Sequence, residues 1–231
     1  MLAQFSPAEL TAIGLSLKVA AVAVLCSLPP GIALGWLLAR RRFPGRLLLD
    51  SALMLPLVVP PVVTGYVLLI LFGAQGPLGR FFADTFGLVF AFRWTGAALA
   101  AAIMSFPLMV RAIRVSIEHV DERLEQAAAT LGAGPLRVFF TVTLPLAWPG
   151  VAAGAVLAFA KALGEFGATI TFVSNIPGET QTLASSIYGL LQVPGGEAGI
   201  WRLTVVALSI SLLAVVASEW LVQRQRREPR G

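Results

Sequence analysis

Lys161 and Glu165 are the residues of this sequence whose type and spacing point most directly to chemistry. They lie four residues apart in an otherwise apolar stretch, residues 150–172, so a helix there places both on one face. A charge at the centre of a membrane helix costs about 2.5–3.5 kcal/mol on insertion scales. Two interpretations stay open: a structural ion pair, or the lining of a polar pathway that also includes Thr169 and Thr171.

The counts of histidine and cysteine argue against an enzyme. His119 and Cys26 are the only residues of their types. His119 has no second histidine or cysteine near it, so a metal site is not expected, and one cysteine cannot form an intrachain disulfide. The phosphate-binding pattern G-x-x-x-x-G-K-[ST] is absent. We therefore predict no catalytic residues, no metal and no cofactor in this chain.

The elements that position Lys161 and Glu165 are predicted to be membrane helices. Of 231 residues, 57% are hydrophobic and 13% are charged, about half the charged fraction of a soluble domain, and the mean hydropathy is +0.83. A helix needs about 20 residues to cross a hydrocarbon core. We predict one all-α domain over 1–231, with five spans near 13–38, 51–72, 94–113, 148–172 and 202–221, a loop at 114–146 and a tail at 222–231.

Basic residues predict the orientation of these spans. Twelve of the seventeen follow the first span, separate the third from the fourth, or follow the fifth. Only Arg80, Arg93 and Arg202 lie between spans on the other side. The positive-inside rule therefore places the loop and the C-terminus in the cytoplasm and the N-terminus outside. The net charge of +5 is explained by these basic residues at the ends of the spans. Nucleic acid is therefore not predicted as a partner. Residues 1–17 contain no Lys or Arg, so a cleavable signal peptide is not expected.

Prolines interrupt several of the predicted spans. The second span reads LPLVVPPVVTGY around Pro60 and Pro61. Proline removes a backbone donor and clashes one turn back, so this helix must bend or unwind. Membranes tolerate loose backbone groups only where protein or a wet cavity surrounds them. Pro60 and Pro61 are therefore candidate pathway residues, and similar interruptions are predicted at Pro29-Pro30 and Pro107, as is typical of transport proteins.

The predicted loop ends in a patterned stretch, EQAAATLGAGPLRVFFTVTLPLAWPG at 125–150. A first short helix is predicted, and Gly132 can end it in the left-handed conformation. Pro135 suits the start of a second helix, which Pro145 is expected to end. The alanines leave a low face that another protein can approach, although a helix resting on the membrane is the alternative. The stripe of the first helix is Leu124, Ala127, Ala128 and Leu131.

This stretch resembles the EAA…G…LP cytoplasmic loop of bacterial ABC importer permeases, with Gln126 as the departure from the pattern. The resemblance implies a type I importer permease core of five transmembrane helices, in which the loop forms a coupling helix that docks into a groove on an ATP-binding subunit. ATP and Mg would then be bound by that partner. The residues that it assigns to ATPase coupling are Glu125, Ala127, Ala128, Leu131, Gly132, Leu136 and Phe139.

A second resemblance concerns the substrate. The segments MSFPLMVRAIR at 104–114 and ALGEFGATITFVSNIPGETQTL at 162–183 are similar to molybdate-transporter permeases, and the likeness covers nearly the whole chain. It implies a multi-pass protein of the bacterial inner membrane that moves molybdate by alternating access. The implied assembly contains two copies of this chain, two ATPases, and a periplasmic or lipid-anchored molybdate-binding protein.

Three alternatives remain open at this point. A sulfate/thiosulfate or tungstate permease belongs to the same class, and sulfate permeases look similar at residues 164–167. A stand-alone secondary transporter or channel belongs to a different class, and it usually has more spans in paired repeats, which this sequence lacks. A membrane scaffold without transport is disfavoured by the prolines within the spans.

Overall fold

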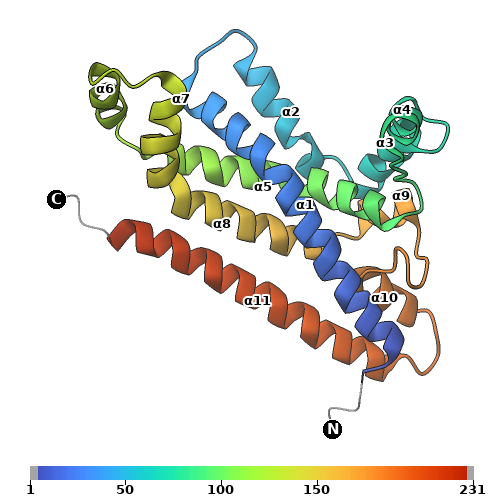
Figure 1. Cartoon of the computed structure of the whole chain (residues 1–231). Helices are drawn as coiled ribbons and strands as arrows, with labels where there is room; N and C mark the ends of the chain where they lie inside the picture. The colour runs from blue at the N-terminus through green and yellow to red at the C-terminus, as the bar shows by residue number, and fades with distance from the viewer. Residues whose placement is uncertain (1–4, 228–231) are drawn as a thin grey trace.

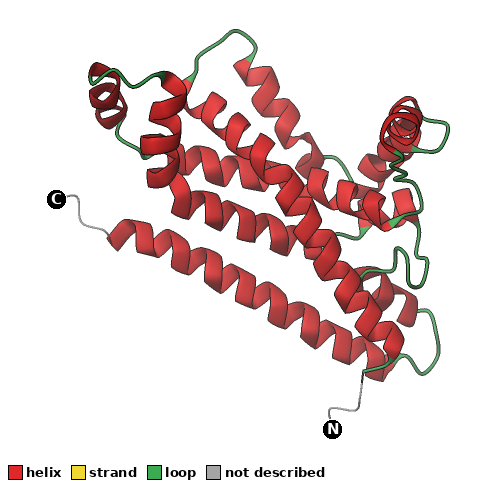
Figure 2. Cartoon of the chain, in the orientation of Figure 1, coloured by secondary structure: helices red, strands yellow, loops and turns green. Residues whose placement is uncertain are grey.

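The computed structural model describes residues 5–227, and for residues 222 and 224–227 it describes the backbone alone. This range is helical and contains no strand (Figure 2), which confirms the all-α prediction. In chain order the helices are α1 (Pro7–Arg40), α2 (Arg46–Val58), α3 (Pro61–Phe72), α4 (Pro77–Phe86), α5 (Trp94–Glu118), α6 (Glu122–Thr130), α7 (Pro135–Val138), the π-helix η1 (Phe139–Thr143), α8 (Leu144–Leu163), α9 (Gly167–Val173), α10 (Leu183–Leu190) and α11 (Glu197–Arg227).

Four helices in the described range are long and apolar enough to cross a membrane. They are α1, α5, the continuous helix Pro135–Leu163 that comprises α7, η1 and α8, and the part Glu197–Leu221 of α11. The helices α2 and α3 pass the same test only as a pair, bent by 110°. The predicted number of five spans therefore holds only if this bent pair crosses the membrane as one span.

The first span begins earlier than predicted. The Ser6 hydroxyl accepts a hydrogen bond from the Glu9 N–H, and the Glu9 carboxylate accepts one from the Ser6 N–H, which is the capping-box arrangement that starts a helix. Pro29 and Pro30 lie inside continuous α1, and Pro107 lies inside continuous α5. The interruptions predicted at these prolines are wrong.

Close packing between α1 and α5 explains why both helices stay continuous. A Cβ atom added at Gly31 would lie 3.0 Å from Met109 Sδ, and one at Gly35 would lie 2.7 Å from Ile113 Cγ2. Small residues allow such close approach between membrane helices, and a neighbouring helix supports the backbone around an internal proline. The two helices therefore form an interlocked pair.

The bend predicted in the second span is confirmed. The helix α2 ends at Val58 and α3 begins at Pro61. The helix α3 packs against α9: a Cβ atom at Gly167 would lie 2.7 Å from Pro61 Cβ, and one at Gly65 would lie 2.5 Å from Ala168 O. The break in the second span therefore lies directly against the break that separates α8 from α9.

The helix end predicted at Pro145 is wrong, and the predicted fourth span, 148–172, contains a helix break at residues 164–166. One helix runs from Pro135 to Leu163 with Pro145 inside it. The Leu144 N–H donates to Phe139 O, five residues back, so the backbone follows a π-helical turn directly before the proline, where an ordinary helical turn would clash. Residues 164–166 then lead into α9.

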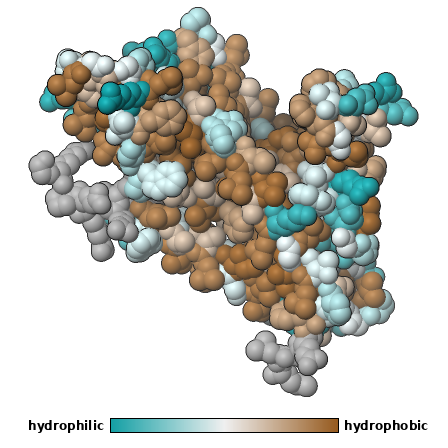
Figure 3. Space-filling view, viewed as in Figure 1, coloured by the Kyte–Doolittle hydropathy of each residue, from teal (hydrophilic) through white to brown (hydrophobic). Residues whose placement is uncertain are grey.

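Figure 1 shows the two ends of the bundle. The helices α6 and α7 and the C-terminal part of α11 lie at one end, whereas α10 and the first turns of α1 and α11 lie at the other. Apolar side chains cover most of the face in Figure 3, and hydrophilic ones gather near α6 and α4. Trp201 and Trp220, near opposite ends of α11, are exposed, as interfacial aromatic residues are. The predicted tail is helical as far as Arg227, and residues 228–231 lie outside the described range.

Candidate functional site

The helix α6 is an exposed element at one end of the bundle. The Asp121 carboxylate caps it by accepting a hydrogen bond from the Arg123 N–H, and α6 contains no buried residue. Gly132 follows the helix with φ of +85°, so the predicted left-handed end is confirmed. The helix is thus held by its ends and its neighbours, since it contributes no side chain to the core.

Several of the residues predicted to dock a partner present apolar surface to the outside. Ala127 is exposed, Leu131 is 89% exposed and Leu136 is 75% exposed. Ala128 is half-buried. Single exposed apolar residues are ordinary, but here they gather on α6, the turn after it and the start of α7, which is typical of a surface that a partner covers.

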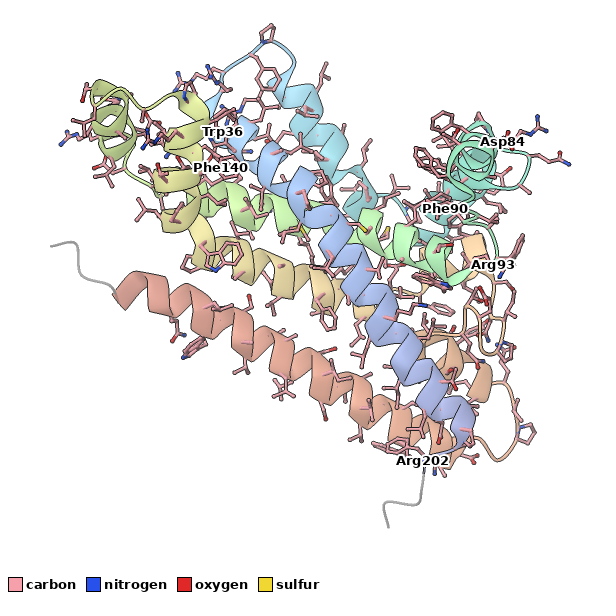
Figure 4. The ribbon with its side chains drawn as sticks, viewed as in Figure 1. Trp36, Asp84, Phe90, Arg93, Phe140 and Arg202 are labelled. Carbon is pink, nitrogen blue, oxygen red and sulfur yellow. The ribbon has the colours of Figure 1, made fainter. Side chains whose placement is uncertain are left out.

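Phe139 and Glu125 differ from the other predicted docking residues because they point inward. The Phe139 ring packs edge-on against Trp36 of α1, with 5.8 Å between ring centroids. Figure 4 shows Trp36 and Phe140 near each other at this end of the molecule. The Glu125 carboxylate is only 18% exposed. Both residues therefore connect the loop to the membrane helices.

Arg40 at the end of α1 and Thr143 in η1 are the partners of Glu125. Arg40 Nη2 and Nε donate to Glu125 Oε1 at 3.0 and 3.2 Å, and Thr143 Oγ1 donates to the same oxygen at 2.7 Å. Arg40 Nη2 also donates to Val120 O at 2.8 Å. The side chains of Arg40, Glu125 and Thr143 border a cavity of about 380 Å³ between α1, α6 and η1.

Lys161 and Glu165 form an ion pair at the other break in the helices. Lys161 Nζ lies 2.9 Å from Glu165 Oε2, and Glu165 Oε1 accepts a hydrogen bond from the Ala168 N–H at 3.0 Å. The Glu165 side chain is 2% exposed and that of Lys161 is 33% exposed. The carboxylate thus ties the end of α8 to the start of α9, while the ammonium group reaches the surface of the chain.

The other residues predicted near a pathway lie around the same break. The hydroxyl of Thr169 donates to Phe166 O at 2.8 Å and that of Thr171 to Gly167 O at 2.9 Å, so both are satisfied within α9. Pro61 contacts Gly167 from α3. This group and the α6 group are not brought together, because the part of the helix between Thr143 and Leu163, about 30 Å long, separates them.

Sequence reasoning missed Arg40 and Thr143. Arg40 belongs to a run of arginines that indicates orientation, and nothing local marks it as the partner of a glutamate 85 residues away. Among the described residues, no group of three or more His, Cys, Asp or Glu side chains could hold a metal ion.

Interrupted apolar helices that carry a partly buried ion pair, together with an exposed short helix at one end, are typical of a membrane transport protein. The chain matches the family described as "Binding-protein-dependent transport system inner membrane component" over residues 31–227, and it belongs to that family. Since the family consists of transport components, the chain is not itself an enzyme.

Individual relatives of known name indicate which transport systems the chain is most similar to. The chain is 60% identical to "Molybdenum transport system permease protein ModB" of Escherichia coli strain K12, over 94% of this chain and 95% of the relative. It is 54% identical to ModB of Haemophilus influenzae, over 95% and 96% of the two chains. The "Sulfate transport system permease protein CysT" of Salmonella typhimurium is more distant, at 36% identity over 98% of this chain and 81% of the relative.

A solved structure shares the fold. It is a bacterial ABC transporter involved in the import of the acidic polysaccharide alginate, and its chain matches with a TM-score of 0.69. The match covers 98% of this chain and 82% of that one at 16% identity, so it establishes the architecture and not the substrate.

Proposed function

We propose that this chain is the membrane-spanning subunit of an ATP-driven importer for molybdate. The main support for an ATP-driven importer is that α6 is an exposed helix without a buried residue at one end of the bundle. The chain also belongs to the binding-protein-dependent transport family. The 60% identity to ModB of Escherichia coli over 94% of the chain supports molybdate as the substrate.

The energy for transport comes from a separate subunit in this proposal. The loop with Ala127, Ala128, Leu131, Gly132 and Leu136 docks into a groove of an ATP-binding subunit, which holds ATP and Mg. The exposed apolar side chains of this loop lose water on docking, and burial of apolar area is favourable by about 25 cal/mol per Å². Closing of the ATP-binding subunits then moves the loop and the spans that are attached to it.

A second copy of this chain completes the pathway. The helix α2 has no buried residue, and α3 exposes Val62, Tyr66 and Ile70, so a large apolar surface beside the paired breaks is left uncovered. A twofold axis along this surface places two copies of the Lys161–Glu165 break around one cavity. Lys161, whose side chain is a third exposed, carries the positive charge at this break that can attract an anion as it passes.

A binding protein delivers the tetrahedral oxyanion to this cavity from outside. The described spans hold no cluster of arginines around the Lys161–Glu165 break, so the pathway attracts a dianion only weakly and releases it readily, and discrimination between oxyanions falls mainly to the binding protein. The test is uptake of radiolabelled molybdate into vesicles that contain this chain, its ATP-binding partner and a loaded binding protein, with sulfate as the competing anion.

The orientation of the chain gives a direct prediction for cysteine labelling. In a Cys26→Ser background, Gln126→Cys in α6 is expected to resist a membrane-impermeant maleimide on intact cells, whereas Pro177→Cys between α9 and α10 reacts. The reason is the excess of basic residues around α6, and both positions are exposed. Labelling of Gln126→Cys after lysis is the control that this cysteine can react. If Gln126→Cys reacts on intact cells and Pro177→Cys does not, the predicted orientation is wrong.

A further inference from the structure

We propose that Arg40 is a positioning residue that transmits the movement of α6 to α1. The inference rests on the proposed function, in which an ATP-binding subunit docks on α6. It assigns to the Arg40–Glu125 contact the task of making α1 follow the coupling loop when the ATP-binding subunits close.

The Arg40 side chain is held in place by several bonds to residues around the start of α6. Arg40 has a side chain that is only 9% exposed and bonds both Glu125 Oε1 and Val120 O. Its Nη1 also lies 3.5 Å from Glu122 Oε1. The guanidinium is planar with donors in a fixed fork, so the end of α1 is held at three points around the start of α6.

Glu125 Oε1 also accepts a hydrogen bond from a third element, the π-helix η1. Thr143 Oγ1, in the π-helix η1, donates to Glu125 Oε1 at 2.7 Å. A π-helical turn marks a place where a helix departs from regular geometry, often at functional sites. The Glu125 side chain therefore joins α1, α6 and the irregular turn that leads into the span α8.

Apart from the contacts of Glu125 with Arg40 and Thr143, few interactions fix the position of α6. None of its residues is buried, and its main backbone neighbours are α7 and η1, the first turns of the long helix Pro135–Leu163. The helix α6 therefore packs mainly against this long helix rather than against α1. The side chains of Glu122 and Glu125 connect α6 directly to Arg40 of α1, next to the ring contact by which Phe139 of η1 packs on α1.

The helix α1 can carry a displacement from one end of the bundle to the other. It is 34 residues long, which is about 51 Å at 1.5 Å per residue, and it interlocks with α5 at Gly31 and Gly35. At its far end, Glu9 Oε1 accepts from Arg202 Nη2 at 2.7 Å, and the Ser16 hydroxyl accepts from the Leu183 N–H at 2.6 Å. Figure 4 shows Arg202 at the end opposite to Trp36 and Phe140.

The test compares Arg40→Gln with Arg41→Gln in the complete transporter in vesicles. Arg41 borders the same cavity, but its guanidinium lies 5.7 Å from the Trp36 ring and forms no hydrogen bond or ion pair with α6 within the described range, so it is the matched control. Three quantities are measured: the amount of ATP-binding subunit that copurifies, the rate of ATP hydrolysis with loaded binding protein, and the number of molybdate ions taken up per ATP hydrolysed.

Arg40→Gln is expected to keep the ATP-binding subunit and to hydrolyse ATP, while uptake per ATP falls about tenfold, within the usual range of coupling between two sites. Arg41→Gln stays at the wild-type ratio. Glu125→Gln is also expected to lower the number of molybdate ions taken up per ATP. It replaces Arg40→Gln in the test if that variant is poorly produced. Because both substitutions remove the same Arg40–Glu125 contact, the double variant is expected to lose no more than the more severe single variant.

Three results would overturn this assignment: a wild-type ratio in Arg40→Gln, losses that add in the double variant, or a loss of bound ATP-binding subunit as large as the loss of uptake. The last result would make Arg40 a docking residue. A wild-type complex that neither binds an ATP-binding subunit nor takes up molybdate would instead refute the proposed function, whatever the behaviour of Arg40.

Discussion

Gly132→Val is expected to abolish ATP-driven uptake while the spans remain inserted in the membrane. Gly132 has φ of +85°, and a Cβ atom there would meet no other atom of the chain within 4 Å. The effect therefore does not come from a clash within this chain. Left-handed backbone costs an L-residue about 1–2 kcal/mol, and a β-branched residue fits it poorly, so valine changes the path of the turn that follows α6.

A bulky side chain at this turn also stands where the ATP-binding subunit is proposed to approach. Gly134 provides the matched control, because it too has open space around a Cβ atom but has φ of −66°, which valine adopts readily. Gly134→Val is expected to retain most uptake. The measurement is copurification of the ATP-binding subunit together with uptake, and full function of Gly132→Val in both would leave α6 as a membrane-surface element.

Glu165→Ala is the second substitution with a large expected effect. It removes the acceptor of the Ala168 N–H and the partner of Lys161. Removing one partner of a fully buried ion pair costs about 3–5 kcal/mol, and the cost here is smaller because water reaches Lys161, which is a third exposed. We expect less protein in the membrane, or normal amounts with impaired uptake if the break lines the pathway.

Glu165→Gln separates these two contributions. The amide oxygen can still accept from the Ala168 N–H, so the start of α9 stays capped and the amount of protein recovers, while the charge opposite Lys161 is lost. Asp84→Ala removes an exposed carboxylate on α4 and serves as the control. Normal protein levels together with normal uptake in Glu165→Ala would exclude both roles for this side chain.

The features that the sequence predicted correctly depend on local chemistry. The bend at Pro60 follows from a missing backbone donor, and the left-handed turn at Gly132 from the lack of a side chain. Helical spacing places Lys161 and Glu165 on one face but leaves open whether they pair, and the distance of 2.9 Å between Lys161 Nζ and Glu165 Oε2 shows that they do. Whether the pair also lines a pathway remains a prediction.

The features that it missed depend on contacts between distant segments. Pro29 and Pro30 are kept in a continuous helix by the packing of Gly31 and Gly35 on α5, which local sequence does not encode. The π-helical turn before Pro145 depends on how η1 joins α8. Glu125 was expected on the docking surface, whereas its carboxylate is mostly occupied by Arg40 and Thr143, and only the folded chain brings those residues together.

Uptake of radiolabelled molybdate by vesicles that contain this chain tests the proposed function most directly. The vesicles hold the chain with its ATP-binding subunit, the binding protein is added on the opposite side, and each component is left out in turn. The expected result is accumulation that needs ATP, the ATP-binding subunit and the binding protein together, and that a large excess of sulfate does not suppress. Accumulation that persists without ATP or its binding subunit, or uptake of sulfate in place of molybdate, would contradict the proposal.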